Sequence, residues 1–592
     1  MPLIVQKAFL FGPKFIYSNY ISPQKVIDNL KKKRNTKMKA LEQDDLYHEL
    51  QNTQQKNQKE HINPKLLEKN MSIWLEKNNL LLQNADKNLC TVLIDKKIYN
   101  QHLNSLINDG NYTPIQESDA IKLVKNNYST LYTKYDKFHR LWEFKKAVKS
   151  QKTFGFPNLY LIPKVHKPKL AFRPIVNQRN FLFTEIFKNI HQYYHEKLNK
   201  HPQKCDFIIN GNMELIKKLD DINLTIKNHN INLQDYDIAS LDVTNLYGNI
   251  DLHEINNTLK NTTNYKNKDD LFYITITQDI ILNNVIEVND NLYKQNKGLA
   301  MGINYAPSLA NYYLFHEFDL RFNNMLQKEH RLWAPLLLYV RFLDDILMIY
   351  HKKWKLFNYV NTTLNNINQN IQFTTEQSKN DSINFMDLTI KLNKDTNQLE
   401  YTNFTKELKT NMMLHFNADF KHKEGLIKSQ FIRIMKNNNN ETTYEKDCQI
   451  LEDGLLLRGY PQQFIKKCKL DYSERENYLN SAKKEQKQQE FSKLLEERKL
   501  LVVDYHQNVH IVKKHLRKKY ENPLFVHKNY QNLYNSFFKN HKNTQYTWYD
   551  KRFTKDNNKS RVKTVPSSVP MVKTSQQKNT LLNYFEKNEN KK

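Results

Sequence analysis

The feature that most limits how this chain can fold is a pair of adjacent aspartates inside a long apolar segment. The segment reads LLLYVRFLDDILMIY at 336–350, and the pair is Asp344 and Asp345. Apolar residues on both sides predict two buried strands, with the aspartates at the turn that joins them. Two like charges next to a buried strand are costly unless a cation offsets them. The segment therefore predicts a β-hairpin that holds a divalent metal ion at its tip.

A second segment supplies a third carboxylate. The sequence YDIASLDVTNLYGNI at 236–250 also reads as a buried strand, and Asp242 lies at its end. One hairpin cannot surround two metal ions, so we expect this strand to lie beside the hairpin. Paired metal ions stabilise both the attacking and the leaving oxygen of a displacement at phosphorus. Together the three aspartates predict phosphoryl transfer.

Composition favours a nucleic acid as the partner. The chain of 592 residues has 91 Lys and Arg against 62 Asp and Glu, which gives a formal net charge of +29. Such an excess suits a polyanion, and the 12% share of aromatic residues suits base stacking. The alternative is a solvated surface whose charge serves solubility.

Other functional classes find little support. The four cysteines occur singly, so neither a disulfide framework nor a cysteine zinc site is indicated, and a reducing compartment fits. No apolar run reaches the roughly 18 residues that a membrane span needs. Segment 1–27 lacks acidic residues, as an organelle presequence does, but lysines interrupt its apolar stretch.

The order of helical and strand-like patterns predicts an α+β fold. Strand-like passages at 233–243 and 336–350 enclose a helical stretch around 306–330. Before the strands, we expect exposed helices with a polar linker at 27–90, then strand-like pieces and a helix, and a hairpin within 151–180. After 393 we expect mostly basic helices, which a low-complexity NNNN interrupts at 437–440. A disordered basic tail is expected at 551–592.

Three segments in order resemble motifs A, B and C of reverse transcriptases. They are SLDVTNLYGNI, YKQNKGLAMGINYAPSLAN and RFLDDILMIY. The resemblance is closest to the Penelope-like element family and covers most of residues 1–540. The further matching segments are FIYSNYISP, NADKNLCTVLIDKKIYNQHL, LYLIPKVHKPKLAFRPIV, INFMDLTI, TKELKTNMMLHFNADFKHKEGLIKSQFIRIM, LRGYPQQFIKK, KLLVVDYHQNVHIVKKHLRKKYENP and HKNYQNLYNSFFKN.

The resemblance implies a right-hand polymerase, with fingers, a palm built on an antiparallel sheet and a helical thumb. Its activity would be RNA-directed DNA synthesis from a primer 3′-hydroxyl with two Mg²⁺ ions, for which Mn²⁺ can substitute, in the nucleus. The expected domains are an N-terminal extension at 1–150, fingers at 151–232, a palm with interleaved fingers elements at 233–392, a thumb at 393–480, a connector at 481–550 and the tail at 551–592.

The resemblance also assigns roles to single residues. Asp242, Asp344 and Asp345 would be catalytic and bind the metal ions, and Tyr247 would be the steric gate that excludes a 2′-hydroxyl. The other expected nucleotide-binding residues are Lys164, Lys167, Arg173, Gln295 and Gly302, and the expected template-primer residues are Lys406, Asn411, Lys421, Lys423 and Arg433. The motif departs from many relatives at Asn304 and Tyr305, where a small residue is usual before the proline.

The C-terminal part raises two further expectations. Many relatives carry a GIY-YIG endonuclease domain, which needs glycines, and no glycine follows Gly459, so we expect a polymerase without its own nuclease. In the tail, Lys578, Leu581, Tyr584 and Phe585 have the spacing of peptides that dock on DNA sliding clamps, although lysine replaces the usual glutamine. Expected partners are thus an RNA template, a DNA primer, dNTPs and a sliding clamp.

Two alternatives remain open at this point. One is a telomerase-like or intron-type reverse transcriptase; the segments ADKN and LRGYP, which match the Penelope-like family, argue against it. The other is a nucleic-acid-binding remnant that no longer polymerises, against which the intact aspartates speak.

Overall fold

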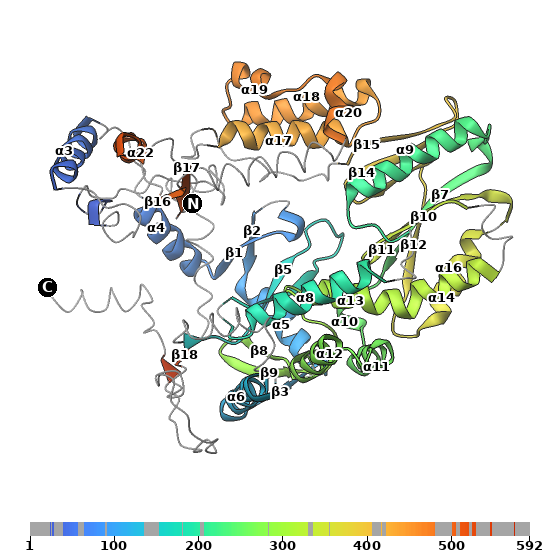
Figure 1. Ribbon diagram of the computed structural model, residues 1–592, viewed down its shortest axis with the longest axis horizontal. Coiled ribbons are helices and arrows are strands. Elements are labelled where there is room, and N and C mark those ends of the chain that lie inside the picture. Colours follow the sequence, from blue (N-terminus) through green and yellow to red (C-terminus); the bar gives the residue numbers. More distant parts are fainter. Residues whose placement is uncertain are drawn as a thin grey trace. The chain divides into compact units, whose positions relative to one another are not determined.

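The chain divides into two compact units in the computed structural model (Figure 1). After their places in the sequence, we call Lys96–Glu400 with Lys542–Lys592 the central unit, and Met1–Asp95 with Tyr401–His541 the flanking unit. Both contain helices and sheets, so the predicted α+β class is confirmed. The structure describes residues 24, 26–28, 40–56, 64–88, 91–134, 153–179, 181–201, 207–281, 283–328, 336–354, 356–404, 416, 422–479, 500–504, 509–519, 524–528, 545–547 and 573–574.

The central unit contains most of the described strands. In chain order its elements are α5 (Lys96–Ile107), β3 (Tyr112–Pro114), α6 (Glu117–Lys134), β4 (Thr153–Phe154), β5 (Asn158–Pro163), β6 (Phe172–Asn177), α8 (Thr184–Asn199), α9 (Asn212–Asn228), η2 (Leu233–Asp235), β7 (Tyr236–Val243), α10 (Leu246–Asn249), α11 (Leu252–Thr262), α12 (Lys268–Ile281), β8 (Val285–Val288), β9 (Asn291–Gln295), α13 (Ala306–Leu314), η3 (Phe315–Asp319), α14 (Leu320–Lys328), β10 (Leu336–Phe342), β11 (Asp345–His351), η4 (Lys352–Trp354), α16 (Leu356–Ile367), β12 (Phe373–Gln377), β13 (Ser382–Phe385), β14 (Leu388–Asn393), β15 (Gln398–Asn403), β18 (Gln545–Thr547) and β19 (Lys573–Thr574).

This unit contains a four-stranded antiparallel sheet, in the order β10-β11-β7-β12. Its two inner strands are buried on both faces: Ile346 to Ile349 and Ile238, Ala239 and Leu241 are each at most 1% exposed. Burial of each large apolar side chain contributes about 1.5–3 kcal/mol. Helices α9, α14 and α16 lie beside the sheet (Figure 1). The strands predicted at 233–243 and 336–350 are confirmed, and the sheet has the antiparallel form expected of a palm.

The same unit contains a five-stranded sheet, ordered β3-β9-β8-β5-β6. Strands β5 and β6 form an antiparallel hairpin from Asn158↔Asn177 to Pro163↔Phe172, which confirms the hairpin predicted within 151–180. Strands β8 and β9 are joined by Asn289 and Asp290, both with positive φ, as tight hairpins require. Strand β9 ends at Gln295 and leads into the loop before α13.

One long helical segment connects the two sheets. It begins at Ala306 with Pro307 in its first turn, where the missing proline N–H costs nothing. Helix α13 packs against α8, and the π-helical turn η3 separates it from α14. The helix predicted around 306–330 is therefore confirmed. The π turn was not predicted.

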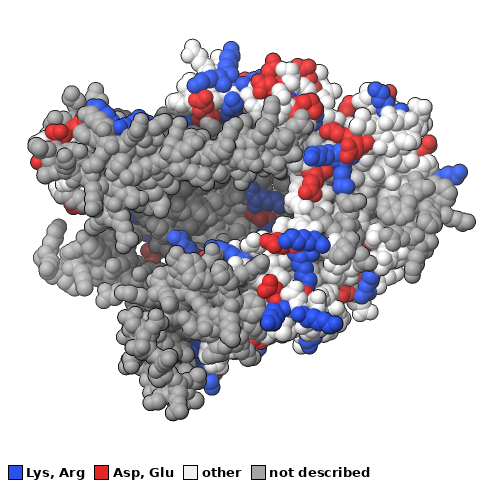
Figure 2. All heavy atoms as spheres, in the orientation of Figure 1, with Lys and Arg blue, Asp and Glu red and all other residues white. Residues whose placement is uncertain are grey.

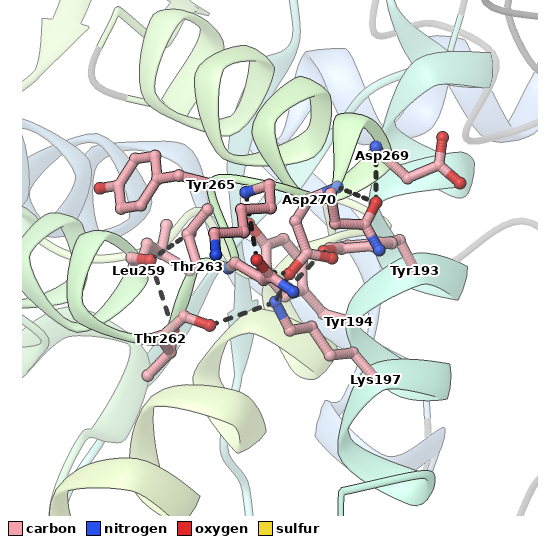
Figure 3. Close-up of polar contacts among 12 residues, drawn as sticks. Tyr193, Tyr194, Lys197, Leu259, Thr262, Thr263, Tyr265, Asp269 and Asp270 are labelled. Carbon is pink, nitrogen blue, oxygen red and sulfur yellow. Dashed lines mark hydrogen bonds and ion pairs between the residues drawn. The ribbon is translucent and has the colours of Figure 1, made fainter.

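A half-buried polar cluster joins helices α8 and α12 (Figure 3). The Tyr193 hydroxyl donates to Asp270 Oδ1 (2.5 Å), and Lys197 Nζ donates to Asp270 Oδ2 (2.7 Å). The Tyr193 ring stacks on Tyr273 with a centroid separation of 4.0 Å. Burial works against the Asp270 charge, but the hydrogen bonds from Lys197 and Tyr193 prevail and lower the pKa of this carboxyl. The cluster therefore stabilises the α8–α12 contact while Asp270 is ionised.

We predict that Asp270→Asn lowers the free energy of unfolding by about 1–3 kcal/mol near pH 7, since a charge-assisted pair is lost. The pKa of Asp270 is lower in the folded chain than its usual value of 3.8, so this stability is present above that value. The difference between variant and wild type should shrink as the pH falls through the lowered pKa. Urea titrations at a series of pH values measure it. Asp269→Asn, at the exposed neighbouring residue, is the control and should change little.

The flanking unit contains the predicted thumb region. Its described elements are α3 (Ala40–Lys56), α4 (Pro64–Lys77), β1 (Leu80–Asn84), η1 (Asp86–Asn88), β2 (Thr91–Asp95), α17 (Lys423–Lys436), α18 (Glu441–Leu457), α19 (Gln462–Cys468), η5 (Tyr472–Glu474), α20 (Arg475–Leu479), β16 (Leu500–Asp504), α22 (Val509–Lys519) and β17 (Leu524–Lys528). The helical pattern predicted after 393 is confirmed in α17–α20, which enclose a core that includes Ile427, Phe431, Tyr444 and Leu455.

The NNNN segment is not a featureless interruption, as its composition suggested. Asn437 donates to Asn403 Oδ1 (3.0 Å), and the fully buried Asn438 donates to Asp447 Oδ2 (2.9 Å). Asn439 Oδ1 accepts from Tyr401 N (3.0 Å), while Asn440 caps α18 by accepting from Thr442 N (2.9 Å). Each asparagine therefore has its own structural task where α17, α18 and β15 meet.

The expectation of exposed helices near the N-terminus is wrong in part. Helix α3 is present, but Leu46 and Leu50 are fully buried, and Glu49 pairs with Lys514 of α22 (2.9 Å). No described helix is long and apolar enough to cross a membrane. Within the predicted tail the described residues are Lys573 and Thr574, which form β19 and pair with β18.

Candidate active site

The aspartate pair lies at the tip of the β10–β11 hairpin, as predicted. Phe342 pairs with Asp345, and Leu343 and Asp344 form the turn between them. Leu343 has φ +53°, a backbone conformation that a large L-residue rarely adopts. Such strain persists only where the surroundings impose it, and it is concentrated at functional sites. The turn that presents Asp344 is therefore held by its environment.

Asp242 lies directly across the sheet from this tip. Its Cα pairs with that of Asp345 between β7 and β11, and Val243 N donates to Asp344 O (3.1 Å). Asp242 is exposed, and the other two aspartates are half-buried. Asp242 precedes the other two aspartates by about a hundred positions, yet the backbones of all three lie at one end of the sheet, as the sequence predicts.

The donor set suits a hard divalent cation, because Mg²⁺ prefers carboxylate oxygens and retained waters. Within the part of the chain that the structure describes, no three His, Cys, Asp or Glu side chains are arranged to hold a metal ion. The backbone register thus brings the carboxylates together, and side-chain torsions would have to close them around a common point.

Tyr247 lies close to the β10–β11 hairpin and to the β5–β6 hairpin. It belongs to the short helix α10, which follows Asn245 in the left-handed conformation (φ +46°). Burial raises the pKa of the Tyr247 hydroxyl to about 12, the Asp344 carboxylate adds to the increase, and the Arg173 guanidinium opposes it. This hydroxyl is therefore within electrostatic reach of one acidic and one basic candidate residue.

Two glycines let the loop before α13 lie close to these elements. A Cβ on Gly298 would be 2.6 Å from Tyr247 O, and one on Gly302 would be 2.7 Å from Val176 O. Both have positive φ, +77° and +102°. Leu299 N donates to Tyr247 O (2.7 Å) and Val176 N to Met301 O (2.7 Å). The glycines therefore serve packing between protein segments, in addition to the predicted approach of a nucleotide to Gly302.

Gln295 is buried and shapes the same loop. Its amide donates to Lys297 O and Gly298 O (both 3.0 Å) and accepts from Asn284 Nδ2 (2.9 Å). These bonds occupy both ends of the amide. The structure thus gives Gln295 a structural task, and its contact with a nucleotide stays a prediction.

The basic residues predicted to bind the nucleotide separate into two groups. Arg173 on β6 reaches the site, since its Nη1 lies 3.5 Å from Met301 Sδ and its charge acts on Tyr247. Lys164 and Lys167 lie in the loop that joins β5 to β6, where Lys164 is half-buried and Lys167 exposed. Their role at a triphosphate stays a prediction.

Of the predicted template-primer residues, Lys423 and Arg433 are on helix α17. The Lys423 ammonium lies 5.2 Å from the ring centre of Phe416, a cation–π contact. Lys406, Asn411 and Lys421 lie outside the described residues, as do the tail residues Lys578, Leu581, Tyr584 and Phe585. On the face drawn in Figure 2, described basic and acidic side chains are interspersed rather than separated into one basic patch.

Sequence reasoning missed three polar residues at the hairpin: Arg341 on β10, and its side-chain partners Asn311 and Asp319. Arg341 is 1% exposed and Asp319 2% exposed. The available signal was a single arginine inside an otherwise apolar strand, YVRF. An isolated charge in such a run needs a buried partner.

Comparisons with known proteins give three results. A family model described as the Animal helix-turn-helix domain matches residues 412–470, which include α17, α18 and α19. No curated protein matches the chain. Several solved structures do.

Telomerase from Candida albicans, in complex with the TWJ fragment of telomeric RNA, is 11% identical with a TM-score of 0.48, and the match covers 79% of this chain and 76% of that one. Apo telomerase from Candida tropicalis is 13% identical with a TM-score of 0.39, covering 74% of each chain. An insertion-loop deletion mutant of the RNA-dependent RNA polymerase of a human picobirnavirus is 9% identical with a TM-score of 0.38, covering 81% of this chain and 93% of that one.

Proposed function

We propose that the chain is an RNA-directed DNA polymerase of the Penelope-like type, which extends a primer 3′-hydroxyl by nucleotidyl transfer. The observation that carries the proposal is the convergence of residues from separate segments at one end of the four-stranded sheet. Asp242 pairs with Asp345, the Asp344 carboxylate acts on Tyr247, and Arg173 acts on Tyr247 from the β5–β6 hairpin. This set supports binding of a nucleoside triphosphate beside a divalent cation.

Each residue has a task in that reaction. Asp242 and Asp344 would hold two Mg²⁺ ions, which Mn²⁺ can replace, and Asp345 would add negative charge beside them. Bound metal ions supply charge stabilisation to the oxygens that change partners at phosphorus. Arg173 would bind phosphate oxygens through its planar fork, and Tyr247 would stack under the sugar and leave no room for a 2′-hydroxyl. The half-burial of Tyr247 supports this task, because a fixed ring excludes an atom better than a mobile one.

The remaining parts of the proposal concern partners and origin. The RNA template and DNA primer would contact basic thumb residues such as Lys423 and Arg433, and such phosphate contacts make binding depend on salt. We further propose a nuclear protein and a tail that docks on a sliding clamp.

Primer extension with purified protein tests the function. On poly(rA) with oligo(dT), wild type should incorporate dTTP when Mg²⁺ or Mn²⁺ is present and not when EDTA is present. If wild type retains RNA and primer-template yet incorporates no dTTP with either ion, the chain is the non-polymerising remnant and the proposal is wrong.

We predict that Tyr247→Ala lowers discrimination against ribonucleotides by roughly 10- to 100-fold, since removal of the ring opens space for the 2′-hydroxyl. The measurement is the ratio of kcat/KM for dTTP and UTP in single-nucleotide extension. Tyr247→Phe is the matched control, because it keeps the ring and removes only the hydroxyl, and it should discriminate like wild type. Unchanged discrimination in Tyr247→Ala would refute the gate.

A further inference from the structure

A buried ion pair lies beneath the catalytic hairpin. The side chains of Arg341 on β10 and Asp319 on η3 are only 2% and 3% exposed. Removing two charges from water costs several kcal/mol per ion, and an apolar pair of similar volume is often as stable or more so. Stability alone therefore does not explain why charges are kept here.

The contacts of the Arg341 guanidinium divide between two targets. On one side Nε donates to both carboxylate oxygens of Asp319 (2.9 and 3.0 Å), and Nη2 donates to Asp319 Oδ2. On the other side Nη1 donates to Asn311 Oδ1 (2.8 Å) and to Leu343 O (2.7 Å). One side chain thus connects the long helix after the glycine loop to the turn of the hairpin.

The carbonyl that accepts from Arg341 belongs to the strained residue of the turn. Leu343, with φ +53°, is joined to Asp344 through a planar peptide unit. A hydrogen bond that fixes the direction of the Leu343 carbonyl therefore also fixes the plane in which the N–H and Cα of Asp344 lie. The strand itself is fixed independently, because Arg341 N donates to Phe207 O (2.8 Å) and Ile209 N donates to Arg341 O (3.0 Å).

The π turn explains how one helix supplies both Asn311 and Asp319. Eight residues of a regular α-helix make about 2.2 turns, which would leave the two side chains about 80° apart around the axis. A π turn adds about one residue to a turn. With η3 between them, the eight-residue separation spans close to two turns, and both side chains can face Arg341. The single irregular turn of this helix therefore has a specific geometric result.

We propose that Arg341, held by Asp319 and Asn311, is a positioning residue that sets the orientation of Asp344 through the Leu343 carbonyl. The proposal rests on the proposed function, since it assigns the network a task in the reaction of Asp344. It goes beyond that function because Arg341 contacts neither the nucleotide nor the primer and acts only through the turn.

Arg341→Lys tests the proposal. Lysine keeps the charge beside Asp319, but its ammonium cannot reach Asp319, Asn311 and Leu343 O together as the fork does. We expect kcat for dTTP to fall about 10- to 100-fold with little change in KM, because a misplaced catalytic group slows chemistry without weakening binding. The Mg²⁺ concentration for half-maximal rate should rise. Arg321→Lys is the matched control, and it should resemble wild type. Arg321 is exposed, pairs with Glu317 and lies on the helical segment that carries Asp319.

A second readout does not depend on activity. Hydrogen exchange of segment 336–350 in the metal-free protein should be faster in Arg341→Lys than in wild type and Arg321→Lys. Asn311→Ala is the second variant, for the case that Arg341→Lys does not fold; it removes one acceptor at a half-buried position. Its changes in kcat, Mg²⁺ requirement and hairpin exchange should be about one third to one tenth as large as those of Arg341→Lys.

The outcomes separate the two proposals. If wild type does not extend primers, the proposed function fails, and hydrogen exchange still shows whether the network holds the turn. If wild type is active and the folded variants match it in kcat, Mg²⁺ requirement and hairpin exchange, the positioning proposal is overturned. A lower melting temperature with unchanged kcat and exchange would mean that the pair is only structural, and would overturn it as well.

Discussion

Asp344→Asn is expected to reduce primer extension at least about a thousandfold, which corresponds to about 4 kcal/mol of transition-state stabilisation. Asparagine has nearly the same shape, so the hairpin should remain folded, but it removes the negative charge that would help hold two Mg²⁺ ions. The loss should appear in kcat, since the charge acts where the oxygens exchange partners at phosphorus. Single-turnover incorporation of dTTP on poly(rA) with oligo(dT) measures it.

The chain offers a matched control in another tight hairpin, β13–β14. Met386 and Asp387 join β13 to β14 as Leu343 and Asp344 join β10 to β11, and Met386 also has positive φ, +54°. Asp387→Asn therefore makes the same chemical change in a turn of the same form, at a residue that is not one of the three aspartates, and extension should stay within about threefold of wild type. Equal activity of Asp344→Asn and Asp387→Asn would contradict the assignment of Asp344.

Asp319→Leu is expected to lower the free energy of unfolding by about 3–5 kcal/mol, because it leaves the buried Arg341 guanidinium without its counter-charge. Urea denaturation near neutral pH measures this. The control is Glu185→Ala, which breaks the exposed Lys188–Glu185 pair and should cost no more than about 1 kcal/mol. If Asp319→Leu lost no more unfolding free energy than Glu185→Ala, the Arg341–Asp319 pair would not be buried away from water, contrary to what its contacts indicate.

A double variant separates stability from positioning. Arg341→Met with Asp319→Leu replaces both charges with apolar groups of similar size, and such replacements are often neutral or stabilising. We expect most of the lost unfolding free energy to return while primer extension stays reduced, because no donor then reaches the Leu343 carbonyl. Recovery of both properties would count against the positioning role of Arg341.

The elements of the central sheet could be predicted because their sequences are locally consistent. Alternation in YDIASLDV and the apolar runs around Asp344 and Asp345 predict strands, and the cost of like charges predicts that the aspartates lie where the strands leave the core. The need for a third carboxylate predicted that the Asp242 strand lies beside the hairpin, although not that Asp242 pairs with Asp345. These predictions rest on short-range patterns and on one electrostatic requirement.

The supporting network could not be predicted because it depends on contacts between distant segments. Arg341 meets Asn311 and Asp319 only because a π turn changes the helix phase, and no residue in FHEFD marks such a turn. The positive φ of Leu343 could not be predicted either, since glycine or asparagine is the usual signal at such a position. Helix α3 has the same difficulty: its charged sequence reads as exposed, and helix α22, which packs against it, lies far away in the chain.

The most direct test of the central claim is a crystal of the protein with primer-template, a non-hydrolysable dNTP analogue and Mn²⁺, examined by anomalous scattering. The account predicts Mn²⁺ at roughly 2.0–2.3 Å from carboxylate oxygens of both Asp242 and Asp344, with the triphosphate beside them. A bound nucleotide with no Mn²⁺ at these carboxylates, or with its Mn²⁺ held by other residues, would contradict the account.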